Sequence, residues 1–259
     1  MRPSRVPLIT LILVLVFFYL PIGFLVLNSF NNSRYASKWS GFSTRWYERL
    51  GDRPDIIAAL GNSVKVATAA SLVSMVLGTA AAFALHRYKS RLQDVHRLFV
   101  TVPLVLPDIL MGMSLLLLFI SFGMSLSLFT ISIAHITFCL SYVALVVQAR
   151  LQDFDFNVVE AARDLGATKV QAFLKVTLPL LAPGILAGGL LAFTLSIDDY
   201  VITYFVKGPG SDTLPTLVYS MIKKSKDLPV INALSSIMLI ITFAVVAVSQ
   251  RLTRPTPVA

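Results

Sequence analysis

The chain has 259 residues, of which 56% are hydrophobic and only 14% are charged. This composition excludes a soluble domain of the same length and predicts a membrane protein with several spans. The net charge of +9 could suggest nucleic acid, but lysines and arginines that flank membrane spans explain it more economically. The single cysteine, Cys139, rules out an internal disulfide.

Six apolar segments are long enough to cross a bilayer as helices, and together they predict a single all-α transmembrane domain over residues 1–259. The first is too long for the core of a signal peptide and has no small-residue cleavage site, so we expect a retained helix. Pro103 and Pro107 interrupt the third, and a tight turn at Gly123 leads into the fourth. The expected spans cover residues 7–30, 62–85, 98–121, 124–147, 180–205 and 230–249.

Small residues mark two of these segments as close-contact helices. The second has alanine, serine or glycine at repeated four-residue spacing, and the fifth carries Gly184 and Gly188 as a GxxxG pair. Small side chains let two helix backbones approach closely in lipid. The contact is expected either with a partner subunit or with a neighbouring helix of the same chain.

A charged, amphipathic stretch separates the fourth and fifth segments, within the hydrophilic connection 148–179. Asn157 and Glu160 have the spacing of an N-terminal capping arrangement, which predicts a short helix from this point to about Leu165. Gly166 follows where a helix commonly ends, because glycine enters the left-handed conformation cheaply.

The same stretch predicts a second helix directly afterwards. Thr168 and Gln171 form another capping box, and an apolar stripe follows it. Pro179 is expected to mark the turn into the fifth apolar segment. The pattern therefore predicts a helix–turn–helix pair outside the bilayer.

This stretch also resembles the EAA loop of bacterial ABC importer permeases, through EAA at 160–162, Gly166 and V-x-L-P at 176–179, where valine replaces the commoner isoleucine. The resemblance implies a type I ABC importer permease fold with six transmembrane helices, whose coupling helix docks on a separate ATPase. Without the resemblance, a surface helix pair that only caps the bundle is an equal alternative. The residues that the resemblance assigns to coupling are Glu160, Ala161, Ala162, Asp164 and Gly166.

No G-x-x-x-x-G-K-[ST] motif, zinc-protease motif or nucleophile elbow occurs in the chain. We therefore expect a transport subunit rather than an enzyme, with no cofactor and no metal of its own. ATP and Mg would be used by the partner ATPase. The lysine and arginine bias between loops is weak, and the EAA resemblance decides for both termini in the cytoplasm.

Acidic residues at membrane depth are the best indication of a substrate, because they are rare and costly there. Asp108 lies in the third segment just after Pro107, where it either faces a pathway or caps a helix that restarts. Asp198 and Asp199 lie in the fifth, and at most one of them is expected to face a narrow pathway. The other candidate pathway residues are Ser196, Tyr200, Tyr204 and, in the first outer loop, Trp46.

Carboxylates beside aromatic rings suit a cation, through charge-assisted hydrogen bonds and cation–π attraction. The stretches SIDDYVITYFVKGPGSDTLPTLVYSMIKKS (196–225) and LVLPDILMGMSL (104–115) resemble spermidine/putrescine importer permeases of the PotC type. That resemblance implies a second homologous permease, two copies of an ABC ATPase, a periplasmic polyamine-binding protein and the bacterial inner membrane. The alternatives are a permease for another solute, such as an amino acid or a metal chelate, and a stand-alone secondary transporter.

Overall fold

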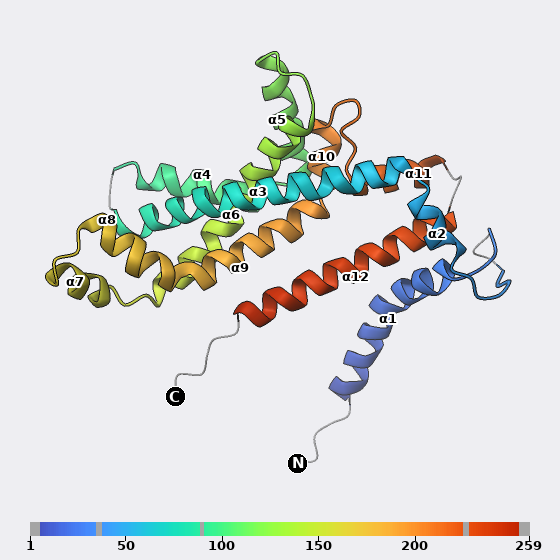
Figure 1. Cartoon of the computed structure of the whole chain (residues 1–259), viewed down its shortest axis with the longest axis horizontal. Coiled ribbons are helices and arrows are strands. Elements are labelled where there is room, and N and C mark those ends of the chain that lie inside the picture. The colour runs from blue at the N-terminus through green and yellow to red at the C-terminus, as the bar shows by residue number, and fades with distance from the viewer. Residues whose placement is uncertain (1–5, 35–37, 89–90, 225–227, 254–259) are drawn as a thin grey trace. The chain divides into compact units, whose positions relative to one another are not determined.

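A computed structural model describes residues 6–34, 38–88, 91–224 and 228–253, and this part of the chain is almost entirely helical (Figure 1). The expected all-α class is confirmed, and the one β pairing among the described residues is an isolated bridge between Asn31 and Phe42. The chain divides into two units. Unit one comprises the chain up to Ile57 and Leu217–Thr242, and unit two comprises Ala58–Thr216 and the chain from Phe243 on.

Four helical stretches of the described chain are long and apolar enough to cross a membrane: Pro7–Ser29, Pro54–Arg87, Leu128–Gln152 and Lys169–Ile197. The bent pair Gln93–Val105 and Asp108–Ser121 makes a fifth candidate. A shorter apolar stretch, Leu228–Ala244, lies in the last helix. Five predicted spans therefore coincide with candidate spans, the bent pair counted as one, while the sixth coincides only with this shorter stretch and stays a prediction.

Unit one contains α1 (Val6–Ser29), α2 (Arg45–Gly51), the first turn of α3 (Pro54–Arg87), most of α11 (Leu214–Lys224) and much of α12 (Leu228–Thr253). The apolar window of α1 has none of its residues buried inside the protein. A helix that is apolar on every face needs an apolar environment outside the chain, which lipid or a partner subunit provides.

Trp46 organises the loop that follows α1. Its indole nitrogen donates a hydrogen bond of 2.7 Å to the backbone oxygen of Asn31, and the Arg45 guanidinium lies 4.1 Å from the centre of its ring. The side-chain oxygen of Asn31 in turn accepts from the amides of Ser33 and Ser40. Trp46 is therefore buried as a structural anchor within unit one.

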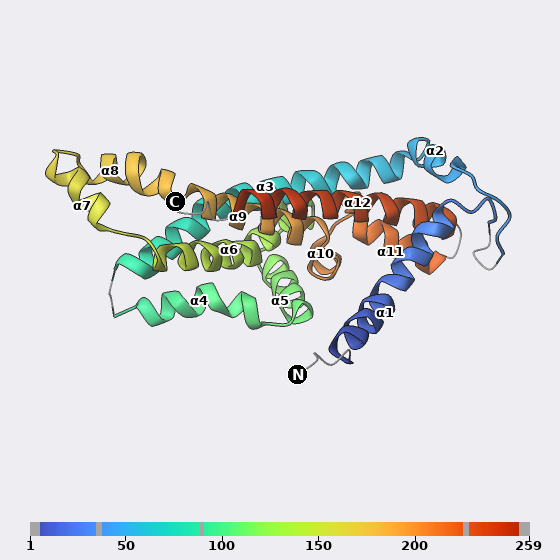
Figure 2. The same cartoon turned by 90° about the horizontal axis from the view of Figure 1, so that it is seen from below.

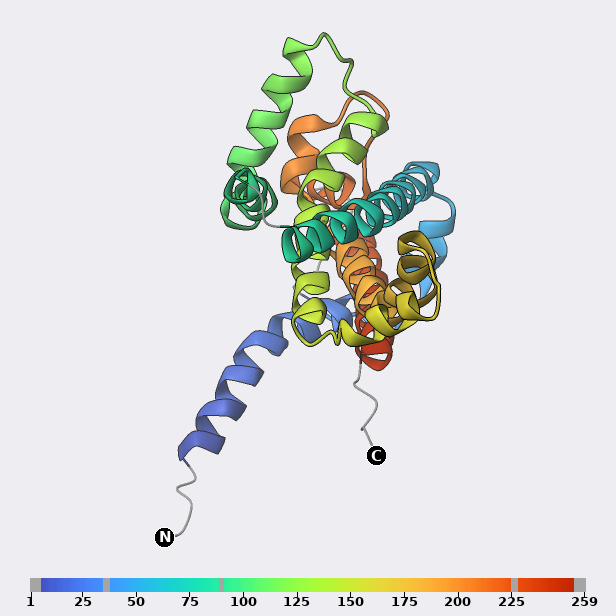
Figure 3. The ribbon, with the colours of Figure 1, turned by 90° about the vertical axis from the view of Figure 1, so that its left-hand side faces the viewer.

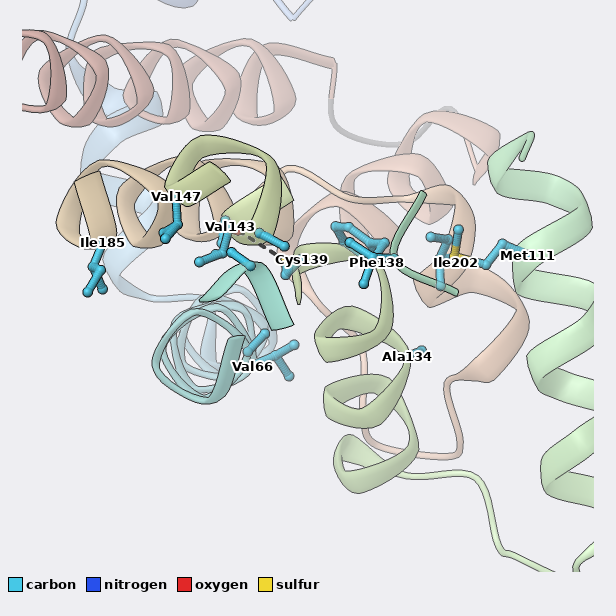
Figure 4. Packing of buried hydrophobic residues seen from close by; sticks show 14 of the residues in the cluster. Val66, Met111, Ala134, Phe138, Cys139, Val143, Val147, Ile185 and Ile202 are labelled. Atoms are coloured by element: carbon cyan, nitrogen blue, oxygen red, sulfur yellow. Dashed lines mark hydrogen bonds between the residues drawn. The ribbon is translucent and has the colours of Figure 1, made fainter. Parts of the chain in front are cut away.

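Unit two is built around α6 (Leu128–Gln152), with α3 and α9 (Leu178–Ile197) packed along it (Figures 1 and 2). Val143 of α6 lies between two glycines: a Cβ on Gly78 would come within 2.8 Å of its Cβ, and one on Gly188 within 3.2 Å of its Cα. The GxxxG pair therefore contacts α6 of the same chain. Figure 4 shows Val143 among the buried residues of this core.

The third predicted span is two helices. The chain bends by 117° between α4 (Gln93–Val105) and α5 (Asp108–Ser121). Figure 3 shows α5 (green) rising from the end of α4. Leu106 is extended, with ψ 135°, because the ring of Pro107 disfavours helical geometry in the residue before it. The helix restarts at Asp108 as expected, but its N-cap residue is Pro107, so the capping interpretation of Asp108 is wrong.

The fifth predicted span is also interrupted. α9 ends at Ile197, and a short helix, α10 (Val201–Val206), begins after the break at Asp198–Tyr200. The sequence pattern predicted one continuous span with Asp198 and Asp199 inside it, so this break was not expected.

The connection between α6 and α9 contains α7 (Asn157–Asp164), whose end at Gly166 is confirmed by a φ of +92°. The predicted capping role of Asn157 is wrong. Its own amide donates to the Asp155 carboxylate at 2.9 Å, so the aspartate just before the helix satisfies a free N–H.

The second capping box is confirmed at α8 (Lys169–Ala172), where Thr168 and Gln171 exchange side-chain to backbone hydrogen bonds. The expected turn at Pro179 is wrong. A π-helical turn, Phe173–Thr177, carries α8 into α9, so Lys169–Ile197 is one helical stretch. The regular hydrogen-bond ladder is already interrupted there, and the missing N–H of Pro179 costs little.

We expect Gly78→Ala to destabilise the protein by roughly 1–3 kcal/mol, because the new methyl would meet the Leu140 backbone oxygen and force α3 away from α6. Gly61→Ala, on the same helix, meets nothing within 4 Å and is the matched control. The measurement is the thermal unfolding midpoint of the detergent-solubilised chain. Equal midpoints for the two variants would contradict the close-contact assignment.

Candidate functional site

The break between α9 and α10 is closed by the side chain of Asp199. Its carboxylate accepts hydrogen bonds from the amide of Ile202 at 3.3 Å and from the amide and hydroxyl of Thr203 at 2.8 Å each. A carboxylate in this position satisfies the free N–H groups at the start of a helix and suits its positive end. The side chain of Asp199 is only 10% exposed, so it sits inside the protein rather than on its surface.

A completely buried imidazole completes this arrangement. His135 of α6 contacts the Ser196 hydroxyl through Nδ1 at 2.7 Å and the Thr203 hydroxyl through Nε2 at 2.9 Å. Its Nε2 also lies 3.3 Å from the Asp199 carboxylate. One ring therefore ties α6 to the end of α9 and the start of α10.

The hydrogen-bond directions in this network are mutually consistent. The Thr203 hydroxyl donates to Asp199, so its oxygen is left to accept from Nε2–H of His135. In the neutral ring, Nδ1 then accepts from the Ser196 hydroxyl. Both ring nitrogens therefore have a hydrogen-bond partner in this tautomer.

Sequence reasoning did not select His135, because only acidic residues were considered as costly at membrane depth. The residue stands in the apolar run ISIAHITF. A lone histidine in such a run is itself a signal, since polar side chains inside membrane segments face partners or cavities.

A cavity of about 100 Å³ adjoins the break and brings together Asp108 and Asp199. Asp108 is in the first turn of α5, directly after the proline bend, and Asp199 reaches the cavity from the α9–α10 break. Two aromatic side chains from α6 line it as well. The remaining lining residues are Pro103, Phe138, Tyr142, Leu195 and Ile202.

The other predicted pathway residues have different surroundings. Ser196 is buried and engaged by His135, while Asp198 is exposed. Tyr200 and Tyr204 lie close together, with ring centroids 5.6 Å apart, and Tyr204 is half exposed. Trp46 belongs to unit one, where it anchors the loop after α1.

The predicted coupling residues form an exposed surface. None of the α7 side chains is buried; Glu160, Ala161 and Asp164 are exposed and Ala162 is partly covered. Leu165 at the tip of the segment is 90% exposed. A short helix with an apolar tip and charged flanks can dock into a partner without rearranging its own chain.

Comparison with known proteins shows the family to which the chain belongs. Residues 74–254 match the family described as the binding-protein-dependent transport system inner membrane component. The spermidine/putrescine transport system permease protein PotC of Haemophilus influenzae is 41% identical over 241 residues, which are 93% of each chain. The putrescine transport system permease protein PotI of Escherichia coli K12 is 43% identical over 239 residues, 90% of this chain and 85% of the relative.

Among solved structures, a chain of a bacterial ABC transporter that imports the acidic polysaccharide alginate shares the fold. Its TM-score is 0.74 at 17% identity, covering 97% of this chain and 98% of that one. The match supports the type I ABC permease architecture expected from the sequence. The chain is therefore a multi-pass membrane transport subunit that belongs to the family of binding-protein-dependent transport system inner membrane components.

Proposed function

We propose that the chain is a permease subunit of an ATP-driven importer for the polyamines spermidine and putrescine. The observation that carries the substrate assignment is the cavity that places two carboxylates, Asp108 and Asp199, beside Phe138 and Tyr142. The relatives at 41% and 43% identity are named for spermidine and putrescine transport. A polyamine is an alkyl chain with ammonium groups, and this set of side chains is complementary to both parts.

The chemistry of the cavity follows from its lining. Each carboxylate can accept charge-assisted hydrogen bonds from an ammonium group, and the aromatic faces attract the cation and cover the methylene stem. Asp199 already accepts from Thr203 and the α10 backbone, so it offers a fixed charge. Asp108 is exposed in the isolated chain and can approach the substrate freely. An anionic solute would be repelled by both.

The remaining parts of the machine are assigned by family resemblance. A second homologous permease would supply the other wall of the pathway, with Asp198, Ser196, Tyr200 and Tyr204 as further candidate lining residues. Two ABC ATPases would use ATP and Mg beneath the pair and receive α7, and a periplasmic polyamine-binding protein would deliver the substrate. This arrangement puts both termini in the cytoplasm and the chain in the bacterial inner membrane.

Asp108→Asn is expected to reduce uptake of labelled spermidine roughly ten- to a hundredfold, since a hydrogen bond to a charged group contributes about 1.5–3 kcal/mol. Assembly should be unchanged, because Asp108 is exposed and caps no helix through its side chain. Asp199→Asn should lower both uptake and thermal stability. Asp198→Asn changes the neighbouring, exposed aspartate and tests whether the loss of either aspartate at the break has the same effect on uptake and stability.

The substrate class is tested in the same cells by competition. Unlabelled putrescine should inhibit spermidine uptake, and a neutral amino acid or sulfate should not. Uptake by the Asp108→Asn variant equal to the unaltered chain would exclude the cavity as the substrate site. A proportional loss of uptake and assembled complex would make Asp108 a structural residue.

His135→Phe is expected to destabilise the chain by about 2 kcal/mol, because it removes the buried hydrogen-bond partner of the Ser196 and Thr203 hydroxyls. Ser141→Ala is the matched control: Ser141 is on the same helix, and its buried hydroxyl has no hydrogen-bond partner among the described residues. Both are compared by thermal unfolding in detergent. If His135→Phe is as stable as Ser141→Ala, the network does not hold the break.

Gly166→Val tests coupling. The left-handed φ of +92° costs a β-branched residue of order 1–2 kcal/mol, so the substitution should displace α7 relative to α8. Gly123→Val introduces the same kind of strain at φ +64°, in the turn between α5 and α6. Substrate-stimulated ATP hydrolysis of the purified complex should fall in Gly166→Val and persist in Gly123→Val. Equal hydrolysis in the two variants would exclude a coupling role for this turn.

A further inference from the structure

A second cavity lies in unit two, away from the two carboxylates. It has a volume of about 600 Å³ and is formed where α3 ends and α8 begins, with one side of α7 closing it. Its lining combines basic side chains with aromatic and aliphatic ones. The lining residues used below are Phe83, Arg87, Arg163, Lys169, Phe173 and Leu174.

The charge of this pocket is entirely positive. Arg87, Arg163 and Lys169 line it, and none of the residues that line it is acidic. Within the described part of the chain, no ion pair involves these three side chains. The carboxylates of Glu160 and Asp164 line a second depression, which Arg163 and Lys169 also border.

The pocket lies between the ends of two helices that are long and apolar enough to cross a membrane. One candidate span ends at Arg87, and another begins at Lys169. Basic side chains at the ends of spans commonly reach the headgroups of the lipids. An anion bound between these two residues would therefore be at headgroup depth.

The inner part of the pocket is apolar. The rings of Phe83 and Phe173 meet edge to face with centroids 5.2 Å apart, and Leu174 is 54% exposed beside them. Phe173 and Leu174 belong to the π-helical turn, a rare widening of the helix that is frequent at functional sites. A small hydrophilic anion would use the basic rim and leave this apolar surface uncovered.

We propose that this pocket is a binding site for an anionic phospholipid. The phosphate would be held by Arg87, Lys169 and Arg163, and the acyl chains would lie against Phe83, Phe173 and Leu174. Basic pockets between membrane helices bind such headgroups through charge complementarity, and the apolar floor selects a lipid over a free phosphate. The proposal uses none of the residues of the polyamine cavity and holds whatever the transported solute is.

The test is photolabelling of the purified complex in nanodiscs made of equal parts phosphatidylcholine and phosphatidylglycerol, with a trace of photoactivatable phosphatidylglycerol. Mass spectrometry should find the label on peptides that contain residues 83–88 and 169–177. Each cation near an anionic headgroup is worth about 1 kcal/mol, a factor of about five. Labelling should therefore fall about fivefold in Arg87→Gln and about twenty-five-fold in Arg87→Gln/Lys169→Gln.

Lys175→Gln is the matched control, because Lys175 is an exposed lysine of the same helical stretch that does not line the pocket. Its labelling should equal that of the unaltered chain, and photoactivatable phosphatidylcholine should label all variants alike. If the double variant fails to assemble, the comparison of labelling between Arg87→Gln and Lys175→Gln still tests the site.

Three results would overturn the proposal. The first is equal labelling of Arg87→Gln and Lys175→Gln. The second is displacement of the label by inorganic phosphate, which would make the pocket a site for a small anion. The third is a photo-crosslinking residue at position 174 that captures the ATPase chain instead of lipid, which would make it a protein contact.

Discussion

The hydrogen bonds of the buried His135 ring hold the helix break of unit two together, because they join α6 to both sides of that break. A helix break at membrane depth exposes amide groups that lipid cannot satisfy, and each would cost several kcal/mol. The Asp199 carboxylate satisfies two of them, and His135 then gives that carboxylate a partner on α6. Because every group has a partner, a charged side chain remains inside the protein without unfolding it.

Two broken helices meet at the cavity for different physical reasons. The α4–α5 bend is made locally by Pro107, whereas the α9–α10 break is held by contacts with α6. The two short helices that follow pack against each other closely: a Cβ on Gly112 would lie 2.7 Å from the ring of Phe205. Irregular backbone is tolerated in membrane proteins where it is buried or lines a cavity. Both breaks meet this condition, because Asp108 at one and Asp199 at the other line the same cavity.

The proposed lipid pocket and the exposed α7 segment share Arg163 and Lys169. The basic side chains face the lipid pocket on one side and the acidic residues of α7 on the other. A lipid there would contact the same loop that the family resemblance assigns to the ATPase. Membrane composition would then bear on the position of α7, because only the short turn through Gly166 separates it from α8.

Local chemistry determined much of this protein from sequence alone: the all-α membrane class, the left-handed Gly166 and the Thr168–Gln171 box each follow from neighbouring residues. Only the tertiary structure decided three other features. It showed that Asp199 accepts hydrogen bonds from the start of α10, that His135 joins α6 to this break, and that Asp108 and Asp199 line one cavity. Lipid and protein core are equally apolar, so hydropathy does not reveal which face of a membrane helix is buried. Hydrogen bonds between distant helices leave no local pattern, and this is why the contacts of His135 with Ser196 and Thr203 could not be predicted.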